Sequence, residues 1–107
     1  MVAIDNLPRV DICGDQIDVH YRSAIDDSPC SETIKSQDIV RIVLERSGDR
    51  VHWFLQHRAG WTLHFNDRFE NAAKVISWLE SFTGVSAPIA SDIAGPFSEG
   101  TVFWSLP

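Results

Sequence analysis

A two-residue alternation of apolar and polar side chains runs through much of the first 65 residues, and this period is typical of half-buried β-strands. Residues 9–22, RVDICGDQIDVHYR, hold two such strands with Gly14 and Asp15 between them. A two-residue turn there places Ile12 opposite Ile17 and brings the apolar sides of both strands together. The segment therefore predicts an antiparallel hairpin.

Three more antiparallel strands are expected in residues 39–65, IVRIVLERSGDRVHWFLQHRAGWTLHF. Turns at residues 48–49 and 58–60 bring the large apolar residues of these strands onto one face. That predicted core face holds Val40, Ile42, Leu44, Trp53, Leu55, Leu63 and Phe65, with His57 and Trp61 at its margin. Most of the aromatic residues in this stretch are therefore assigned to the core.

The remaining extended segments are shorter. Residues 23–38, SAIDDSPCSETIKSQD, interrupt the alternation, and their Ser, Thr, Asp and Pro content predicts a loop with a short edge strand near 33–35. The stretch TVFWSL at residues 101–106 predicts a last strand. Val102 and Trp104 would share one side of this strand and Phe103 the other, which indicates burial on both sides.

Residues 67–83 change the apolar period to 3.6, which predicts a helix packed on the sheet. Asp67 and Glu70 fit a capping box at its start, and Gly84 fits a left-handed cap at its end. We therefore expect an α+β fold in which a curved antiparallel sheet of five to six strands carries this main helix. The prediction places residues 1–107 in a single globular domain.

A short second helix is expected near residues 86–94. Ser86 would be its N-cap, and Ile89 and Ile93 would face inward. A break follows at Gly95-Pro96, before the last strand.

Charge and composition limit the partners. The 9 Lys and Arg residues against 15 Asp and Glu give a net charge of −6, which repels phosphate backbones and anionic lipid surfaces. Neither nucleic acid nor a membrane is therefore expected as a partner. Residues 1–10 lack the basic start and apolar stretch of a signal peptide, so we expect a cytoplasmic protein. Cys13 and Cys30 form no CxxC motif, and whether they pair depends on their geometry.

The histidines offer one candidate metal site. In the predicted register His52 lies opposite Glu45 and diagonal to His64, so the three could form a two-histidine, one-carboxylate cluster on the outer sheet face. We favour the alternative, in which Glu45 and His52 form an exposed cross-strand pair and His64 packs on Phe54. The sequence contains no nucleophile motif and no glycine-rich phosphate loop, and we expect no cofactor.

Aspartates form the second candidate site. Asp11 and Asp18 are expected side by side across the first hairpin, a like-charge pair that Arg9 and Arg22 could neutralise. The alternative is an acidic edge that docks a basic protein. Its candidate contact residues are Asp11, Asp15, Asp18, Asp26 and Asp27.

The outer sheet face is unusually apolar for a solvated surface, because Val43 and Phe54 are predicted neighbours there. A cover is therefore expected. The candidates are the last strand with its Phe103 and Trp104, which we favour, a second copy in a homodimer, or another protein. In the last two cases Phe54 joins the predicted contact residues.

The sequence resembles a group of small uncharacterised bacterial proteins over residues 36–106. The matching pattern consists of Asp38-Ile39, Trp53-Phe54, Leu79, Phe82, Gly84 and Trp104. The resemblance implies a pleckstrin-homology-like or immunity-protein-like α+β domain without catalytic residues. The turn at residues 57–60 departs from the acidic, longer loop of the commoner pattern.

Two classes of function follow. The first is a non-enzymatic protein-interaction domain, in its specific form an acidic immunity-type inhibitor of a basic bacterial toxin. The second is a small-ligand or metal-dependent enzyme that uses Glu45, His52 and His64. An exposed acidic and aromatic patch would favour the first class, and a deep pocket around the histidines would favour the second.

Overall fold

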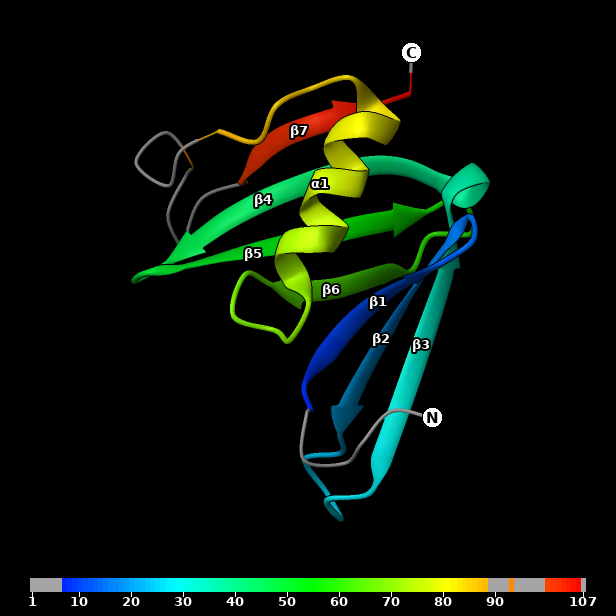
Figure 1. The fold of residues 1–107 in the computed structure, drawn as a ribbon, viewed down its shortest axis with the longest axis vertical. Helices are drawn as coiled ribbons and strands as arrows, with labels where there is room; N and C mark the ends of the chain where they lie inside the picture. Colours follow the sequence, from blue (N-terminus) through cyan, green and yellow to red (C-terminus); the bar gives the residue numbers. More distant parts are fainter. Residues whose placement is uncertain (1–6, 89–92, 94–99, 107) are drawn as a thin grey trace.

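The computed structural model describes residues 7–88, 93 and 100–106, which form an α+β fold of two antiparallel sheets with an α-helix (Figure 1). The first sheet has the order β1-β2-β3, with β1 at Arg9–Cys13, β2 at Gln16–Arg22 and β3 at Pro29–Lys35. Ile12 pairs with Ile17, which confirms the predicted register of the first hairpin. β3 is longer than the predicted edge strand and pairs with β2 over its full length.

The second sheet has the order β6-β5-β4-β7. Its strands are β4 at Ile39–Ser47, β5 at Arg50–His57, β6 at Thr62–Asn66 and β7 at Thr101–Ser105. Trp53 of β5 lies opposite Leu44 on one side and Phe65 on the other, which confirms the predicted pairing of these three strands.

The prediction of one curved sheet of five to six strands is wrong, because the chain changes direction between β3 and β4. A short 3-10 helix, Ser36–Asp38, makes this change. Its backbone contacts both sheets: Ser36 N donates to Asp15 O at 2.8 Å, and Arg58 N donates to Asp38 O at 2.9 Å. β4 then pairs with β5 and β7, so the strands of the two sheets run in different directions (Figure 1).

β4 carries an irregularity in each of its two ladders. Against β5 the register shifts between Ile39 and Arg41, so the core receives Ile39 where the strict alternation predicted Val40. Against β7 it shifts between Ile42 and Val43. A bulge of this kind turns two successive residues of one strand toward the same side.

The second irregularity changes the orientation of β7. Phe103 lies against Trp53 with ring centroids 5.1 Å apart, and Trp104 lies against Phe82 of the helix at 5.4 Å. Val102 points the other way and is exposed. The predicted placement of Trp104 beside Val102 is therefore wrong. The last strand, β7, pairs with the edge of β4 within the same sheet. The favoured prediction that this strand covers the outer face is therefore wrong for its described residues.

The helix α1 spans Ala72–Thr83 and begins five residues later than predicted. The expected capping box is absent because its residues bond elsewhere: Val51 N donates to the Asp67 carboxylate at 3.2 Å, and Val10 N donates to Glu70 O at 3.0 Å. Asn71, in the left-handed region, precedes the helix instead. Gly84 ends it as predicted, with φ 74° and its N–H donating to Glu80 O at 2.8 Å.

The expected second helix near 86–94 falls largely on residues 89–92 and 94, which lie outside the described part of the chain, as does Ile89. Residues 86–88 are not helical, so Ser86 is not a helix N-cap there. Ile93 is buried, as predicted.

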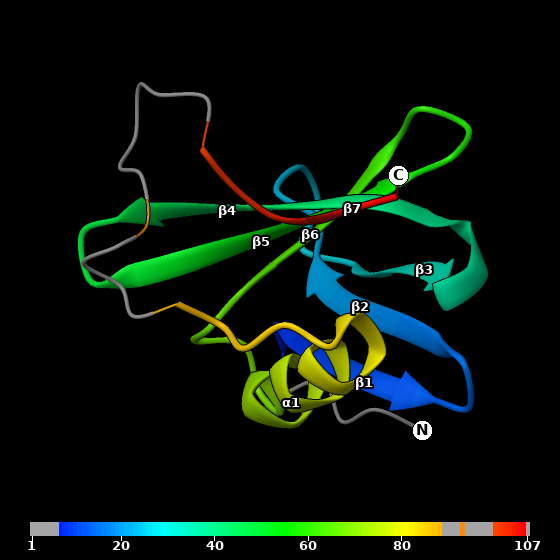
Figure 2. The same cartoon turned by 90° about the horizontal axis from the view of Figure 1, so that it is seen from above.

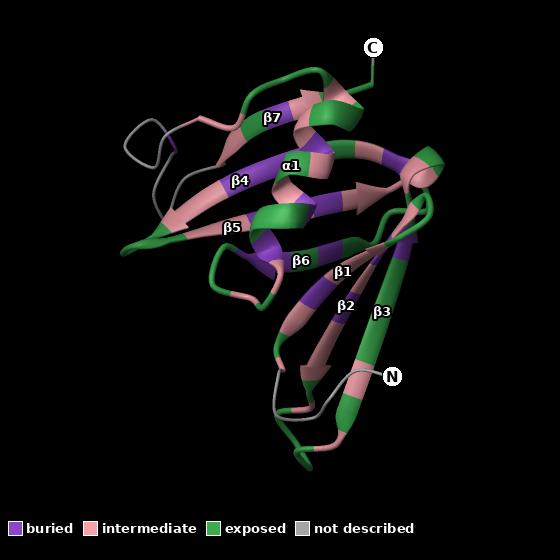
Figure 3. Cartoon of the chain, in the orientation of Figure 1, coloured by how far each residue is buried: buried purple, intermediate pink, exposed green. Residues whose placement is uncertain are grey.

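The core lies between α1 and the two sheets, and the buried segments concentrate where α1 crosses β4, β5 and β6 (Figure 3). Its largest fully buried side chains are Trp53, Phe65, Ile17, Ile34, Ile39, Ile42, Leu44, Leu55, Leu63 and Leu79. Both cysteines are free thiols. Within the described ranges, no helix has the length and apolar character needed to cross a membrane.

Candidate functional site

The outer face of the second sheet points away from α1 (Figure 2) and carries the predicted apolar pair. Val43 of β4 and Phe54 of β5 are direct cross-strand partners, as expected. They line a hollow of about 570 Å³ together with Arg41, Glu45, Gln56 and Thr62, and we call it the outer hollow. An apolar centre with a polar and charged rim is the usual composition of a contact surface.

A second hollow adjoins the first at Thr62, which lines both. This side hollow measures about 370 Å³ and lies between the first sheet and β6. Its lining consists of Val19, Tyr21, Glu32, Thr62, His64 and Phe69. The turn that connects β5 to β6 rises on the side of the second sheet away from α1 (Figure 2).

His52 and His64 form a close pair on this face. Nδ1 of His52 and Nε2 of His64 are 2.8 Å apart, so one ring donates a hydrogen bond to the other. The ring of His64 also stacks on Phe54 at a centroid distance of 5.0 Å, as predicted. Glu45 lies opposite His52 in the ladder, again as predicted.

The metal cluster of Glu45, His52 and His64 is not assembled. Among the described residues, no group of three or more His, Cys, Asp or Glu side chains is placed to hold a metal ion. The two imidazoles are instead hydrogen-bonded directly to each other, which occupies the lone pair of the accepting nitrogen.

His64 has a pKa below its ordinary value of 6.5. Burial is the larger cause, because it disfavours the charged imidazolium, and the nearby charge of His52 is the second. His64 is thus protonated less readily in the folded state than in the unfolded chain. It follows that the stabilisation from neutral His64 is complete above the unfolded pKa and is lost as the pH falls through the folded pKa.

We expect the free energy of unfolding to decrease as the pH is lowered below about 6.5. Replacing His64 with glutamine should flatten this decrease, because glutamine does not titrate. Urea unfolding followed by circular dichroism across this pH range measures both slopes. Equal slopes in the two proteins would contradict the assigned role of His64.

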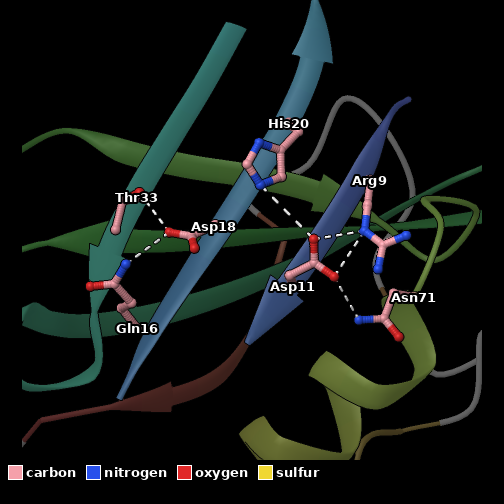
Figure 4. Close-up of polar contacts among 7 residues, drawn as sticks. All are labelled: Arg9, Asp11, Gln16, Asp18, His20, Thr33 and Asn71. Atoms are coloured by element: carbon pink, nitrogen blue, oxygen red, sulfur yellow. Dashed lines mark hydrogen bonds and ion pairs between the residues drawn. The ribbon is translucent and has the colours of Figure 1, made fainter. Parts of the chain in front are cut away.

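Two of the predicted contact aspartates are engaged within the first sheet (Figure 4). Asp11 and Asp18 are cross-strand partners, as predicted, but each has its own partners. Asp11 accepts from Arg9 Nε at 2.7 Å and from Asn71 Nδ2 at 3.0 Å, and its side chain is only 22% exposed. Arg9 therefore neutralises Asp11, as predicted. Thr33 Oγ1 donates to Asp18 at 2.6 Å.

The other three aspartates do not join them in one patch. Asp15 lies at the β1–β2 turn, whereas Asp26 and Asp27 lie at the β2–β3 turn, at the opposite end of the first sheet (Figure 1). The seven residues of β2 separate these turns by about 20 Å. Arg22 pairs with Asp27 at 3.5 Å, away from the Asp11–Asp18 pair that it was expected to neutralise. The predicted acidic edge is thus divided.

The pKa of Asp26 lies below its ordinary value, first because Ser28 donates a side-chain hydrogen bond and then because its backbone N–H donates another. Asp26 is exposed and lies in the β2–β3 turn, at the end of the first sheet farthest from β4 and β5 (Figure 1). It lines neither of the two hollows.

Sequence reasoning missed three residues of the side hollow. Tyr21 and Glu32 come from the first sheet, and Phe69 comes from the segment before α1. Nothing in their local sequence signals a shared site, because only the packing of the first sheet against β6 brings them together. Comparisons with protein-family models, with curated proteins and with solved structures gave no match. The resemblance to small bacterial proteins therefore stays a prediction.

Proposed function

We propose that this chain is a non-enzymatic protein-interaction domain that binds its partner through the outer hollow. The observation that carries the proposal is the half-buried ring of Phe54, which lies beside the buried Val43 in a hollow that polar and charged side chains also line. Aromatic residues at the centre of such a surface supply most of the binding energy once water is excluded. Phe54 is therefore the anchor of the proposed interface.

The proposed partner is a basic protein. The net charge of −6 favours it, and Glu45 supplies a carboxylate to the outer hollow, where Arg41 also lies. Opposite charges accelerate association, while the apolar centre limits dissociation. The specific form of this proposal is an immunity-type inhibitor of a bacterial toxin, acting in the cytoplasm. It rests on the sequence resemblance described above.

Replacement of Phe54 by aspartate is expected to weaken partner binding by about 30-fold or more, the usual effect of losing a central aromatic anchor. The partner is first captured with the tagged protein from a host lysate and identified by mass spectrometry. The affinity of the purified pair is then measured at two salt concentrations, and high salt should weaken it.

Val85→Asp is the control, because Val85 is an exposed apolar residue that follows α1, on the opposite side of the second sheet from the half-buried Phe54. This variant should bind the partner as the unchanged chain does. Full affinity in Phe54→Asp would contradict the proposed interface. Capture of a second copy of the chain alone would replace the basic partner with a homodimer.

A further inference from the structure

The side hollow has the size of a small-molecule site. Its volume of about 370 Å³ falls within the range of about 300–1,000 Å³ that such sites occupy. Val19 and Tyr21 of β2 form one wall, and Phe69 adds a second aromatic ring. These side chains can enclose an apolar body, and the two rings can face a cation.

Glu32 supplies negative charge to this hollow. It lies opposite Val19 in the β2–β3 ladder, and its charge is the largest cause of a raised pKa at Tyr21, followed by the hydrogen bond between the two side chains. The phenol of Tyr21 therefore keeps its proton. Burial lowers the pKa of His64 on the other wall, so its imidazole is neutral at neutral pH.

The described lining thus combines one carboxylate with neutral aromatic and aliphatic groups. An anion would meet the charge of Glu32, whereas an uncharged ligand would gain nothing from it. We propose that the side hollow binds a small organic amine, with its ammonium group against Glu32 and its apolar body against Val19, Tyr21 and Phe69. This site is separate from the protein interface proposed above, because its recognition does not use Phe54.

The charged and titratable groups around the site also determine its pH dependence. Glu32 and Tyr21 face the hollow from the first sheet, and His64 faces it from β6, with His52 hydrogen-bonded behind it. Protonation of His64 would place positive charge beside the bound ammonium. Amine binding should therefore weaken as the pH falls through the lowered pKa of His64.

The test is a titration of the ¹⁵N-labelled full chain with 2-phenylethylamine, followed by amide chemical shifts. The matched probes are 2-phenylethanol, which is uncharged, and phenylacetate, which is an anion. We expect saturable shifts in β2, β3 and β6 with the amine, and binding of the alcohol about tenfold weaker or less. Phenylacetate should give no saturable shifts.

Glu32→Gln should weaken amine binding about tenfold while leaving the affinity for the alcohol unchanged. Glu45→Gln removes a carboxylate from the outer hollow instead and should leave amine binding unchanged. The amide spectrum of each variant shows whether it is folded. The proposal is overturned if amine and alcohol bind equally, if Glu32→Gln retains full amine affinity, or if no saturable shifts occur. Amine titration tests this site and partner affinity tests the protein interface, so the two proposals fail independently.

Discussion

Replacing Trp53 with alanine is expected to lower the free energy of unfolding by about 3–5 kcal/mol, the usual effect of removing a large buried aromatic ring. Trp53 is 2% exposed and lies between two other rings. Its ring centroid is 5.9 Å from that of Phe65 and 5.1 Å from that of Phe103. Because these rings belong to three different strands, the cavity would weaken the contacts across the whole second sheet.

Urea unfolding followed by circular dichroism measures this loss. Trp61→Ala is the matched control, because Trp61 is 41% exposed and its ring stacks only at the margin of the core, 4.3 Å from His57. The control should lose about 1 kcal/mol or less. Similar losses in the two variants would contradict the assignment of Trp53 to the centre of the core.

Gly100→Ala is expected to destabilise the chain by about 2–5 kcal/mol, for two reasons that add. Gly100 has φ +82°, a conformation that side chains with a Cβ rarely adopt. In addition, a Cβ built there would lie 2.7 Å from Val43 Cγ1 and 3.1 Å from Leu44 O. Because the backbone oxygen belongs to β4, the clash would displace the start of β7 from its partner strand.

Gly84→Ala separates the two contributions. Gly84 has a similar φ of +74°, but no atom lies within 4 Å of a Cβ at that position. This control should therefore lose only the backbone part, about 1–2 kcal/mol. Hydrogen exchange of the β7 amides should increase in Gly100→Ala and stay unchanged in Gly84→Ala. A loss in Gly100→Ala no larger than in the control would contradict the close approach to β4.

Much of the strand pairing could be predicted from the sequence, because a tight turn and a two-residue period determine register locally. The pairing of Ile12 with Ile17 and of Leu44 with Trp53 follows from these two features alone. The division into two sheets could not be predicted in this way. It depends on hydrogen bonds of the Ser36–Asp38 turn to residues distant in the chain, such as Asp15.

Helix boundaries and bulges show the same limit. Asp67 and Glu70 have the spacing of a capping box, but backbone groups of neighbouring strands compete for both residues. Similarly, nothing in the residues of β4 marks the positions where its register shifts. The start of the helix and the register shifts of β4 depend on hydrogen bonds between segments distant in the chain. The local sequence does not show these bonds.

Some features of the candidate site could likewise be predicted from the sequence, and others could not. The outer position of Phe54 and its contact with His64 follow from strand alternation. The predicted acidic edge is not a single surface. Residue spacing could not show that Asp11 bonds to Asn71, which lies 60 residues further along the chain. The side hollow requires the arrangement of the two sheets, so only the folded structure reveals it.

The position of β7 determines when the second sheet can be completed during synthesis of the chain. Residues 41–44 of β4 pair with residues 101–105 of β7, and the ring of Phe103 lies against Trp53. Until β7 has been synthesised, β4 has one open edge and Trp53 lacks this neighbour. An open strand edge is a template for incorrect pairing. The growing chain therefore passes through a stage in which protection of β4 by a chaperone would favour correct folding.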